Sequence, residues 1–199
     1  GSTRMGRHVS EVVGRRLGRS LLELGGNNAV IVTEDADLEL ALRAVVFGAV
    51  GTAGQRCTTT RRLIIHTSVK DAFLDRLIRV YKQLPIGNPL DEKVLMGPLV
   101  DAEAGADMEA ALAAAKQGGG RVLYGSERVY PAGCDGGYYV QPAIVEAPPD
   151  LPIMQEETFA PILYVVAYSD FDEAIALHNG VRQGLSSAIF TRSLHYSEQ

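Results

Sequence analysis

The sequence lacks several features that would point to a specialised class of protein. Tryptophan is absent, aromatic residues make up only 7% of the chain, and its 199 residues include only two cysteines. No apolar run approaches the roughly 18 residues of a membrane span, and no signal-peptide pattern opens the chain. The net charge is −5, and the basic residues are scattered. These absences argue against a disulfide framework, a nucleic-acid partner and a membrane partner, and they favour a reducing, cytoplasmic compartment.

The composition is otherwise that of an ordinary globular domain, with 46% hydrophobic residues and enough length for one substantial core. Strand-like apolar runs alternate with helical patterns. We expect helices over residues 4–16, 38–50, 69–83, 102–117 and 171–178, and strands over residues 20–24, 28–33, 62–66, 121–124, 138–145, 162–168 and 185–191. Pro142 interrupts one of these strands, which places that strand at an edge or a bulge. The alternation predicts an α/β fold with a mostly parallel open sheet flanked by helices.

The most distinctive stretch is residues 51–60, Gly-Thr-Ala-Gly-Gln-Arg-Cys-Thr-Thr-Thr. Its two glycines let the backbone approach whatever lies beside it, because glycine has no side chain and tolerates positive φ. A thiol held in such a bend has its own N–H nearby, which can serve as half of an oxyanion hole. On its own Cys57 is ambiguous, because a free cysteine is more often a small buried hydrophobe than a nucleophile.

Two other stretches carry groups suited to catalysis. Glu23 ends the strand expected over residues 20–24, and ligands of open α/β sheets bind at strand ends and in the loops that follow them. A carboxylate there can act as a general base on water, although a lone glutamate is more often solvated or salt-bridged. Residues 155–161, Gln-Glu-Glu-Thr-Phe-Ala-Pro, combine two carboxylates, a ring and a rigid proline. These side chains can bind a ribose and a flat heterocycle. They are equally consistent with an ordinary surface turn.

Together these stretches resemble the NAD(P)-dependent aldehyde dehydrogenase superfamily. The resemblance lies in Leu-Glu-Leu-Gly-Gly-Asn-Asn at residues 22–28, Gly-Gln-Arg-Cys at 54–57, Glu-Glu-Thr-Phe-Ala-Pro at 156–161 and the opening Gly-Ser-Thr-x-x-Gly. It extends over the whole chain. Within the superfamily, residues 23–28, 48–59, 159–164 and 183–187 look like the antiquitin group, which oxidises α-aminoadipic semialdehyde in lysine breakdown.

The resemblance implies a role for each of several residues. Cys57 corresponds to the nucleophile that adds to the aldehyde, and Glu23 to the base that activates water against the resulting thioester. Glu157 corresponds to the residue that holds the nicotinamide ribose, Phe159 to the ring beside the nicotinamide, and Ser2 to a residue near the cofactor phosphates. The implied cofactor is NAD, with NADP as an alternative, and no metal is assigned.

Arg56 precedes the expected nucleophile, and the resemblance implies that it binds a carboxylate of the substrate. A guanidinium offers paired donors to a carboxylate, which would favour a small-molecule aldehyde that also carries an acidic group. The alternative is that Arg56 forms a salt bridge within the protein or activates the thiol.

The resemblance also implies how much of the family's fold is present. We expect residues 1–25 to be the C-terminal remnant of an NAD-binding domain, and residues 26–199 to be the catalytic domain, truncated at its C-terminal end. The chain would then be a piece of a longer protein and inactive by itself, with a parent that forms a homo-oligomer, either a dimer or a tetramer.

Two other functions compete with this interpretation. A cysteine hydrolase would need a histidine beside the thiol, and the four histidines, at positions 8, 66, 178 and 195, have no supporting motif. A non-catalytic binding or assembly module is the second alternative.

Overall fold

Six strands form one open sheet in the order β3-β6-β7-β2-β1-β8, and every neighbouring pair is parallel except β3 with β6. The computed structural model describes residues 1–199. The strands of this sheet are β1 (Asn28–Val32), β2 (Thr60–His66), β3 (Arg121–Tyr124), β6 (Ala143–Glu146), β7 (Ile162–Tyr168) and β8 (Ser187–Phe190). The prediction of a mostly parallel α/β sheet is therefore confirmed.

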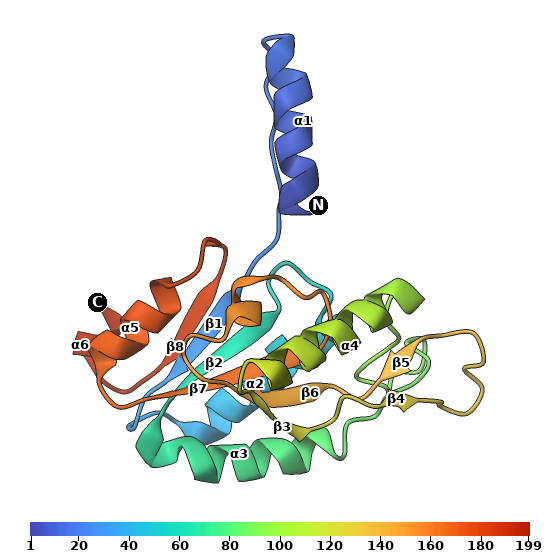
Figure 1. The fold of residues 1–199 in the computed structure, drawn as a ribbon. Helices are drawn as coiled ribbons and strands as arrows, with labels where there is room; N and C mark the ends of the chain where they lie inside the picture. The colour runs from blue at the N-terminus through green and yellow to red at the C-terminus, as the bar shows by residue number, and fades with distance from the viewer.

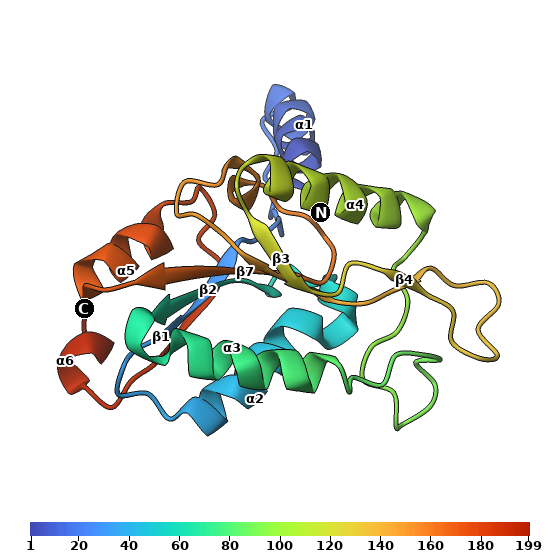
Figure 2. The ribbon, with the colours of Figure 1, turned by 60° about the horizontal axis from the view of Figure 1, so that its bottom comes forward.

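Helices cover both faces of the sheet, with α2 and α3 on one face and α4 and α5 on the other (Figures 1 and 2). The α-helices are α1 (Thr3–Arg15), α2 (Leu38–Val50), α3 (Thr67–Tyr81), α4 (Ala102–Gln117), α5 (Phe171–Asn179) and α6 (Leu194–Ser197), and two 3-10 helices are η1 (Gly51–Gly54) and η2 (Pro152–Gln155). Because both faces are covered, the central strands are almost continuously buried.

Two of the strand predictions are wrong. Residues 20–24 form no strand, and the chain runs beside α1 back to the sheet with Leu21 91% exposed. An extended segment needs a neighbour for its backbone groups, and this one has none in the sheet. The strand expected over residues 138–145 is divided at Pro142, which has no N–H to donate to a ladder. Its first part, β5 (Tyr139–Val140), pairs with β4 (Arg128–Val129) in a separate ribbon, and β6 lies inside the main sheet rather than at an edge.

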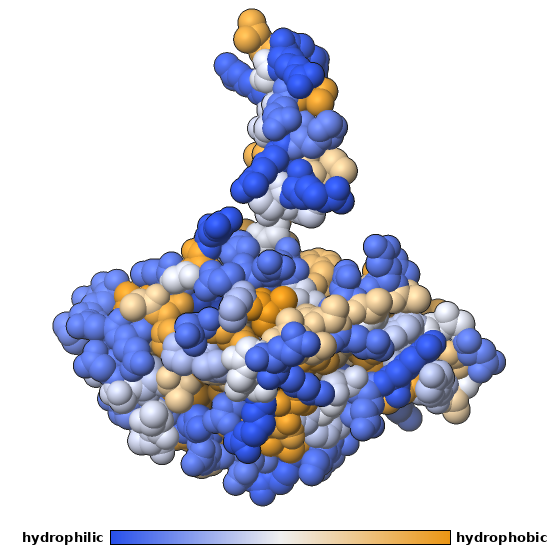
Figure 3. Space-filling model, viewed as in Figure 1, coloured by the Kyte–Doolittle hydropathy of each residue, from blue (hydrophilic) through white to orange (hydrophobic).

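Helix α1 projects from the body of the molecule, as Figures 1 and 3 show. Gly6 is its only buried residue and packs against Leu24. Its apolar residues Met5, Val9 and Val12 are 37–50% exposed. In Figure 3 the surface of this helix is largely polar, with a few separate hydrophobic spots. None of the helices combines the length and apolar character needed to span a membrane.

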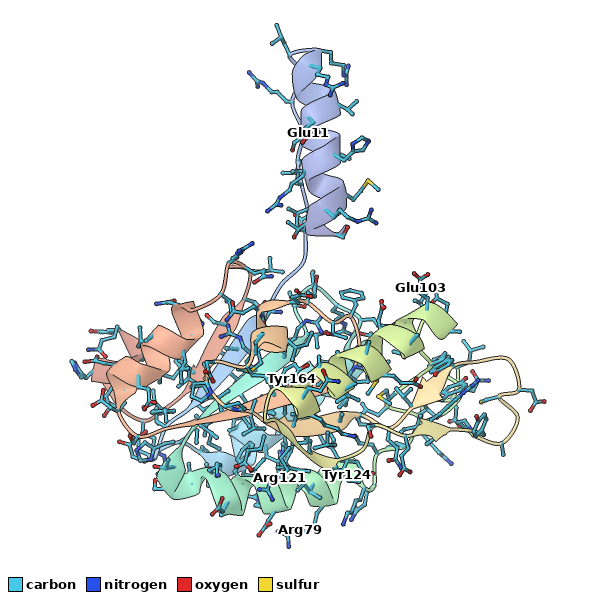
Figure 4. The ribbon with its side chains drawn as sticks, viewed as in Figure 1. Glu11, Arg79, Glu103, Arg121, Tyr124 and Tyr164 are labelled. Carbon is cyan, nitrogen blue, oxygen red and sulfur yellow. The ribbon has the colours of Figure 1, made fainter.

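The main core lies between the sheet and its covering helices and contains 34 buried residues. A smaller cluster of six buried residues packs where α5 meets β1 and β2. Tyr164 of β7 lies in the interior, and Arg79 of α3 and Glu103 of α4 point outward (Figure 4). The buried strands β1, β2 and β7 are adjacent in the sheet, and they provide a rigid base for the segments that precede them.

Candidate active site

The three stretches with catalytic potential lie at the amino ends of three adjacent strands. Residues 25–27 lead into β1, the Cys57 turn leads into β2, and residues 156–161 lead into β7. Because these strands are parallel, the three segments meet at one edge of the sheet. The expectation that the site follows the strands, at their carboxyl ends, is wrong. The site precedes them.

One cavity at this edge brings four of the six predicted site residues together. Its volume is about 340 Å³, and its lining consists of Gly1, Ser2, Leu24, Gly25, Cys57, Glu157 and Phe159. Cys57 is half-buried, and Phe159 is 44% exposed. The cavity therefore presents a thiol, a carboxylate and an aromatic ring to the same space.

The turn that carries Cys57 has an unusual backbone. Thr52, Ala53 and Gly54 all have positive φ, at 54°, 52° and 69°. Non-glycine residues rarely adopt this left-handed conformation, and each costs about 1–3 kcal/mol unless its surroundings impose it. Gly54 is required here, because a Cβ at this position would overlap the backbone of Ala160. The turn is thus forced against the segment that leads into β7.

The backbone of Cys57 is fixed on one side and free on the other. Its carbonyl accepts a hydrogen bond from Asn28 Nδ2 at 2.7 Å, and the same amide nitrogen also donates to the Thr59 carbonyl at 2.8 Å. The Cys57 N–H donates to no acceptor in the protein. A free N–H next to a thiol is the arrangement that one half of an oxyanion hole requires.

Gly25 and Gly26 allow the segments to approach one another closely. A Cβ on Gly26 would collide with the Cys57 carbonyl oxygen, and a Cβ on Gly25 would collide with the Glu157 carboxylate. The Gly26 N–H donates to Glu157 Oε1 at 3.0 Å. The glycine pair therefore connects the thiol turn with the carboxylate, a function that sequence patterning alone did not assign to it.

Arg61 is a buried neighbour of the cavity lining that the sequence did not reveal. It is buried, and it donates to Glu157 Oε1 at 3.3 Å and to the Thr158 carbonyl at 2.6 Å. Burial lowers the pKa of Arg61, and the Glu157 carboxylate offsets part of this effect. Both protein hydrogen bonds to Glu157 go to Oε1, and Oε2 has no hydrogen-bond donor in the protein. From sequence alone, two adjacent arginines such as Arg61 and Arg62 are expected to be exposed. Their burial becomes apparent only because strand β2 lies in the middle of the sheet.

The structure does not bring Glu23 or Arg56 to the cavity. Glu23 is exposed, and its side chain does not line the cavity, although its neighbours Leu24 and Gly25 do. The Arg56 guanidinium is exposed and lies over the ring of Phe47, 5.6 Å from its centroid. Ser2 lines the cavity, and its hydroxyl caps α1 by accepting from Met5 N at 3.2 Å.

No histidine lines the cavity, so the thiol has no imidazole partner there. His66 Nδ1 lies 2.7 Å from Ser68 Oγ at the start of α3, and His178 Nδ1 lies 3.0 Å from Asn179 Oδ1 at the end of α5. His195 lies in α6 near Gln199, and His8 lies in α1. This placement weighs against a cysteine hydrolase built on a thiol–imidazole pair.

Fold and site together define an α/β protein whose thiol-bearing cavity lies at the amino edge of a parallel sheet. The chain belongs to the aldehyde dehydrogenase family, whose model matches residues 1–199. It is 49% identical over 193 residues to aldehyde dehydrogenase family 7 member B4 of Arabidopsis thaliana, covering 97% of this chain and 37% of that protein. It is 50% identical over 196 residues to alpha-aminoadipic semialdehyde dehydrogenase of Mus musculus, covering 98% of this chain and 35% of that protein.

Solved structures show the same architecture. PnpE from Pseudomonas sp. WBC-3 superimposes with a TM-score of 0.95 at 37% identity, over 100% of this chain and 41% of that one. Betaine aldehyde dehydrogenase from Staphylococcus aureus, solved in complex with NAD+, also gives a TM-score of 0.95, at 30% identity over 40% of its length. The chain thus spans about two fifths or less of the length of these relatives.

Proposed function

We propose that the protein containing this chain oxidises an aldehyde to a carboxylic acid with NAD+, through a covalent intermediate on Cys57. The observation that carries the proposal is the shared cavity, whose lining includes the Cys57 thiol, Glu157 with one carboxylate oxygen unpaired, and the exposed Phe159 ring. The family membership and the NAD+ complex of a solved relative support the same assignment.

The residues at the cavity fit the nicotinamide end of a dinucleotide. Glu157 Oε2 has no donor within the protein and can accept from a ribose hydroxyl, and Phe159 offers an exposed ring face to the nicotinamide. We assign Ser2, at the start of α1, to the cofactor phosphates, because a helix N-terminus favours negative charge. NAD+, when bound, supplies the acceptor for the hydride that leaves the substrate carbon, and NADP+ would supply the same chemistry.

The chain's own residues carry the covalent part of the reaction. The Cys57 thiol loses its proton to solvent, and the thiolate sulfur adds to the aldehyde carbon as the C=O π bond breaks. The resulting oxyanion, the deprotonated thiohemiacetal, accepts a hydrogen bond from the free Cys57 N–H. After oxidation the substrate is a thioester on Cys57. Water then attacks this thioester. From the family resemblance we assign Glu23 as the base that takes the proton from the water, a role for which its exposed side chain has to turn toward the cavity that its neighbours Leu24 and Gly25 line. The products are the carboxylic acid and the free thiol.

We further propose that the substrate is a semialdehyde with an acidic group, such as α-aminoadipic semialdehyde, and that Arg56 contacts this group. The support is the 50% identity to a protein of that name and the exposed guanidinium beside Cys57 in the sequence. Because α1 and the chain that follows it project from the body of the molecule, we assign residues 1–25 to a cofactor domain and residues 26–199 to the catalytic domain. We propose that the whole protein is needed for activity and that it forms a homo-oligomer.

Replacing Cys57 tests the central assignment. Cys57→Ala in the intact protein should abolish both NAD-dependent aldehyde oxidation and hydrolysis of p-nitrophenyl acetate, because both would pass through an acyl-cysteine. Cys134→Ala is the matched control, because Cys134 is also a half-buried free thiol but does not line this cavity. Turnover of Cys57→Ala within about tenfold of the wild type, a barrier change of only about 1.4 kcal/mol, would overturn the nucleophile assignment.

A further inference from the structure

The contacts of Arg61 join two segments that belong to different strands. On the nucleophile side, its Nη2 donates to the carbonyls of Arg56 at 3.2 Å and Gly54 at 3.4 Å. On the β7 side, it donates to Glu157 Oε1 and to the Thr158 carbonyl, and its guanidinium lies 5.5 Å from the centroid of the Phe159 ring. Its side chain is only 3% exposed. One buried guanidinium thus contacts both the Cys57 turn and the segment that carries Glu157 and Phe159.

We propose that Arg61 is a positioning residue that fixes the segment carrying Glu157 and Phe159 relative to the Cys57 turn. The inference rests on the proposed function, since it concerns the spacing between the nucleophile and the cofactor-binding side of that site. Arg61 does not face the cavity, so it acts through the segments that it joins.

The geometry requires an arginine and not merely a positive charge. A guanidinium is a planar fork of five N–H donors, and it can reach acceptors on several segments at once. A lysine has three donors on one atom and cannot satisfy carbonyls that lie in different directions. Isolated burial of a charge is costly, and here Glu157 supplies the only opposite charge within salt-bridge distance. The ion pair therefore stabilises the buried Arg61 guanidinium and at the same time orients the Glu157 carboxylate.

Arg62 provides a control with nearly the same burial. It is 5% exposed, against 3% for Arg61, and it follows Arg61 on the same strand. Its guanidinium donates to the carbonyls of Asn27 at 2.8 Å and Leu177 at 2.7 Å, and to the His178 carbonyl at 3.1 Å. The bonds to Leu177 and His178 cap the last turn of α5, and the bond to Asn27 holds the residue that follows Gly26. None of them reaches the Cys57 turn or residues 157–159. If both arginines only stabilised the fold, replacing either one would change aldehyde oxidation, ester hydrolysis and NAD+ affinity in the same pattern.

The test compares Arg61→Lys with Arg62→Lys in the intact protein. Four readouts are needed: thermal unfolding, hydrolysis of p-nitrophenyl acetate without cofactor, oxidation of hexanal, and calorimetric titration with NAD+. For Arg61→Lys we expect aldehyde oxidation to fall about 100-fold, since misplacement of reacting groups by about 1 Å has a cost of that size. NAD+ binding should weaken about tenfold, which corresponds to the loss of about one good hydrogen bond. Ester hydrolysis, which needs the thiol but no cofactor, should stay within about threefold of the wild type.

Arg62→Lys should change aldehyde oxidation and ester hydrolysis in the same proportion and leave NAD+ affinity unchanged. The proposal is overturned if Arg61→Lys shows that same proportional loss, with no change in NAD+ affinity. If Arg61→Lys does not fold, Arg61→Gln, which buries no charge, is measured and judged by the same criteria. Failure of the proposed function has a different signature: the wild-type protein would then bind no NAD+, or Cys57→Ala would retain both activities.

Discussion

Gly26→Ala perturbs the site at the point where the backbone of residue 26 approaches the Cys57 carbonyl. A Cβ at residue 26 would lie well inside 3.0 Å of that carbonyl oxygen, a distance that real Cβ atoms essentially never show. It would also lie 3.0 Å from both polar atoms of the Asn28 amide. The obstacle is backbone and not the end of a flexible side chain, so the Cys57 turn itself has to move.

The size of the effect follows from these contacts. Forcing an extra methyl into a packed site costs about 1–3 kcal/mol in the free energy of unfolding. Moving the Cys57 carbonyl also disturbs its 2.7 Å hydrogen bond from Asn28, worth about 1 kcal/mol. A displacement of about 1 Å at a reacting group reduces its rate about 100-fold, and we expect ester hydrolysis by Gly26→Ala to fall by that factor.

The assay is hydrolysis of p-nitrophenyl acetate by the intact protein, with thermal unfolding measured in parallel. Gly136→Ala is the control, because a Cβ there meets no heavy atom within 4 Å, and it should leave both measurements unchanged. If Gly26→Ala behaves like Gly136→Ala in both assays, the close approach of residue 26 to the thiol turn is not what orders the site, and the reasoning fails.

Two further predictions concern the residues that the structure leaves outside the cavity. Glu23→Gln should slow deacylation more than oxidation, so rapid mixing should show a burst of NADH followed by very slow turnover; equal losses of burst and steady-state rates would contradict a separate base. Arg56→Ala should lower kcat/KM for α-aminoadipic semialdehyde about 30-fold, a loss of about 2 kcal/mol in transition-state stabilisation, because a lost charged hydrogen bond is worth about that much. The kcat/KM for hexanal should stay unchanged. Equal losses for both aldehydes would assign Arg56 to its packing on Phe47.

The helices were predictable where local chemistry marks their ends. α2 and α4 have the predicted bounds, because Asp37 and Asp101 accept hydrogen bonds from the first-turn N–H groups, and Gly118 follows the last residue of α4. The strand expected over residues 20–24 had the right composition, but strand formation depends on a partner that local sequence does not specify.

The site was predictable only in part. Motif resemblance selected six residues. The structure places Ser2, Cys57, Glu157 and Phe159 around one cavity and leaves Glu23 and Arg56 outside it. The resemblance gave no role to Arg61 or Asn28, since their importance arises from carbonyl groups contributed by distant residues such as Thr158 and Cys57. A backbone acceptor leaves no signature in the side-chain sequence, so contacts of this type are visible only once the chain is folded.

Because the site lies at the starts of three neighbouring strands, the spacing of the strands sets the distances between its chemical groups. Cys57 is separated from β2 by two residues, Phe159 from β7 by two, and Gly26 from β1 by one. Neighbouring strands lie about 4.8 Å apart, and hydrogen bonding along the ladder fixes that repeat. With tethers this short, lengthening a loop would disturb the strand that follows it. Natural or engineered tuning of the spacing between thiol and carboxylate is therefore confined to side-chain length and to the glycines between the segments, and this limits how such a site can diverge.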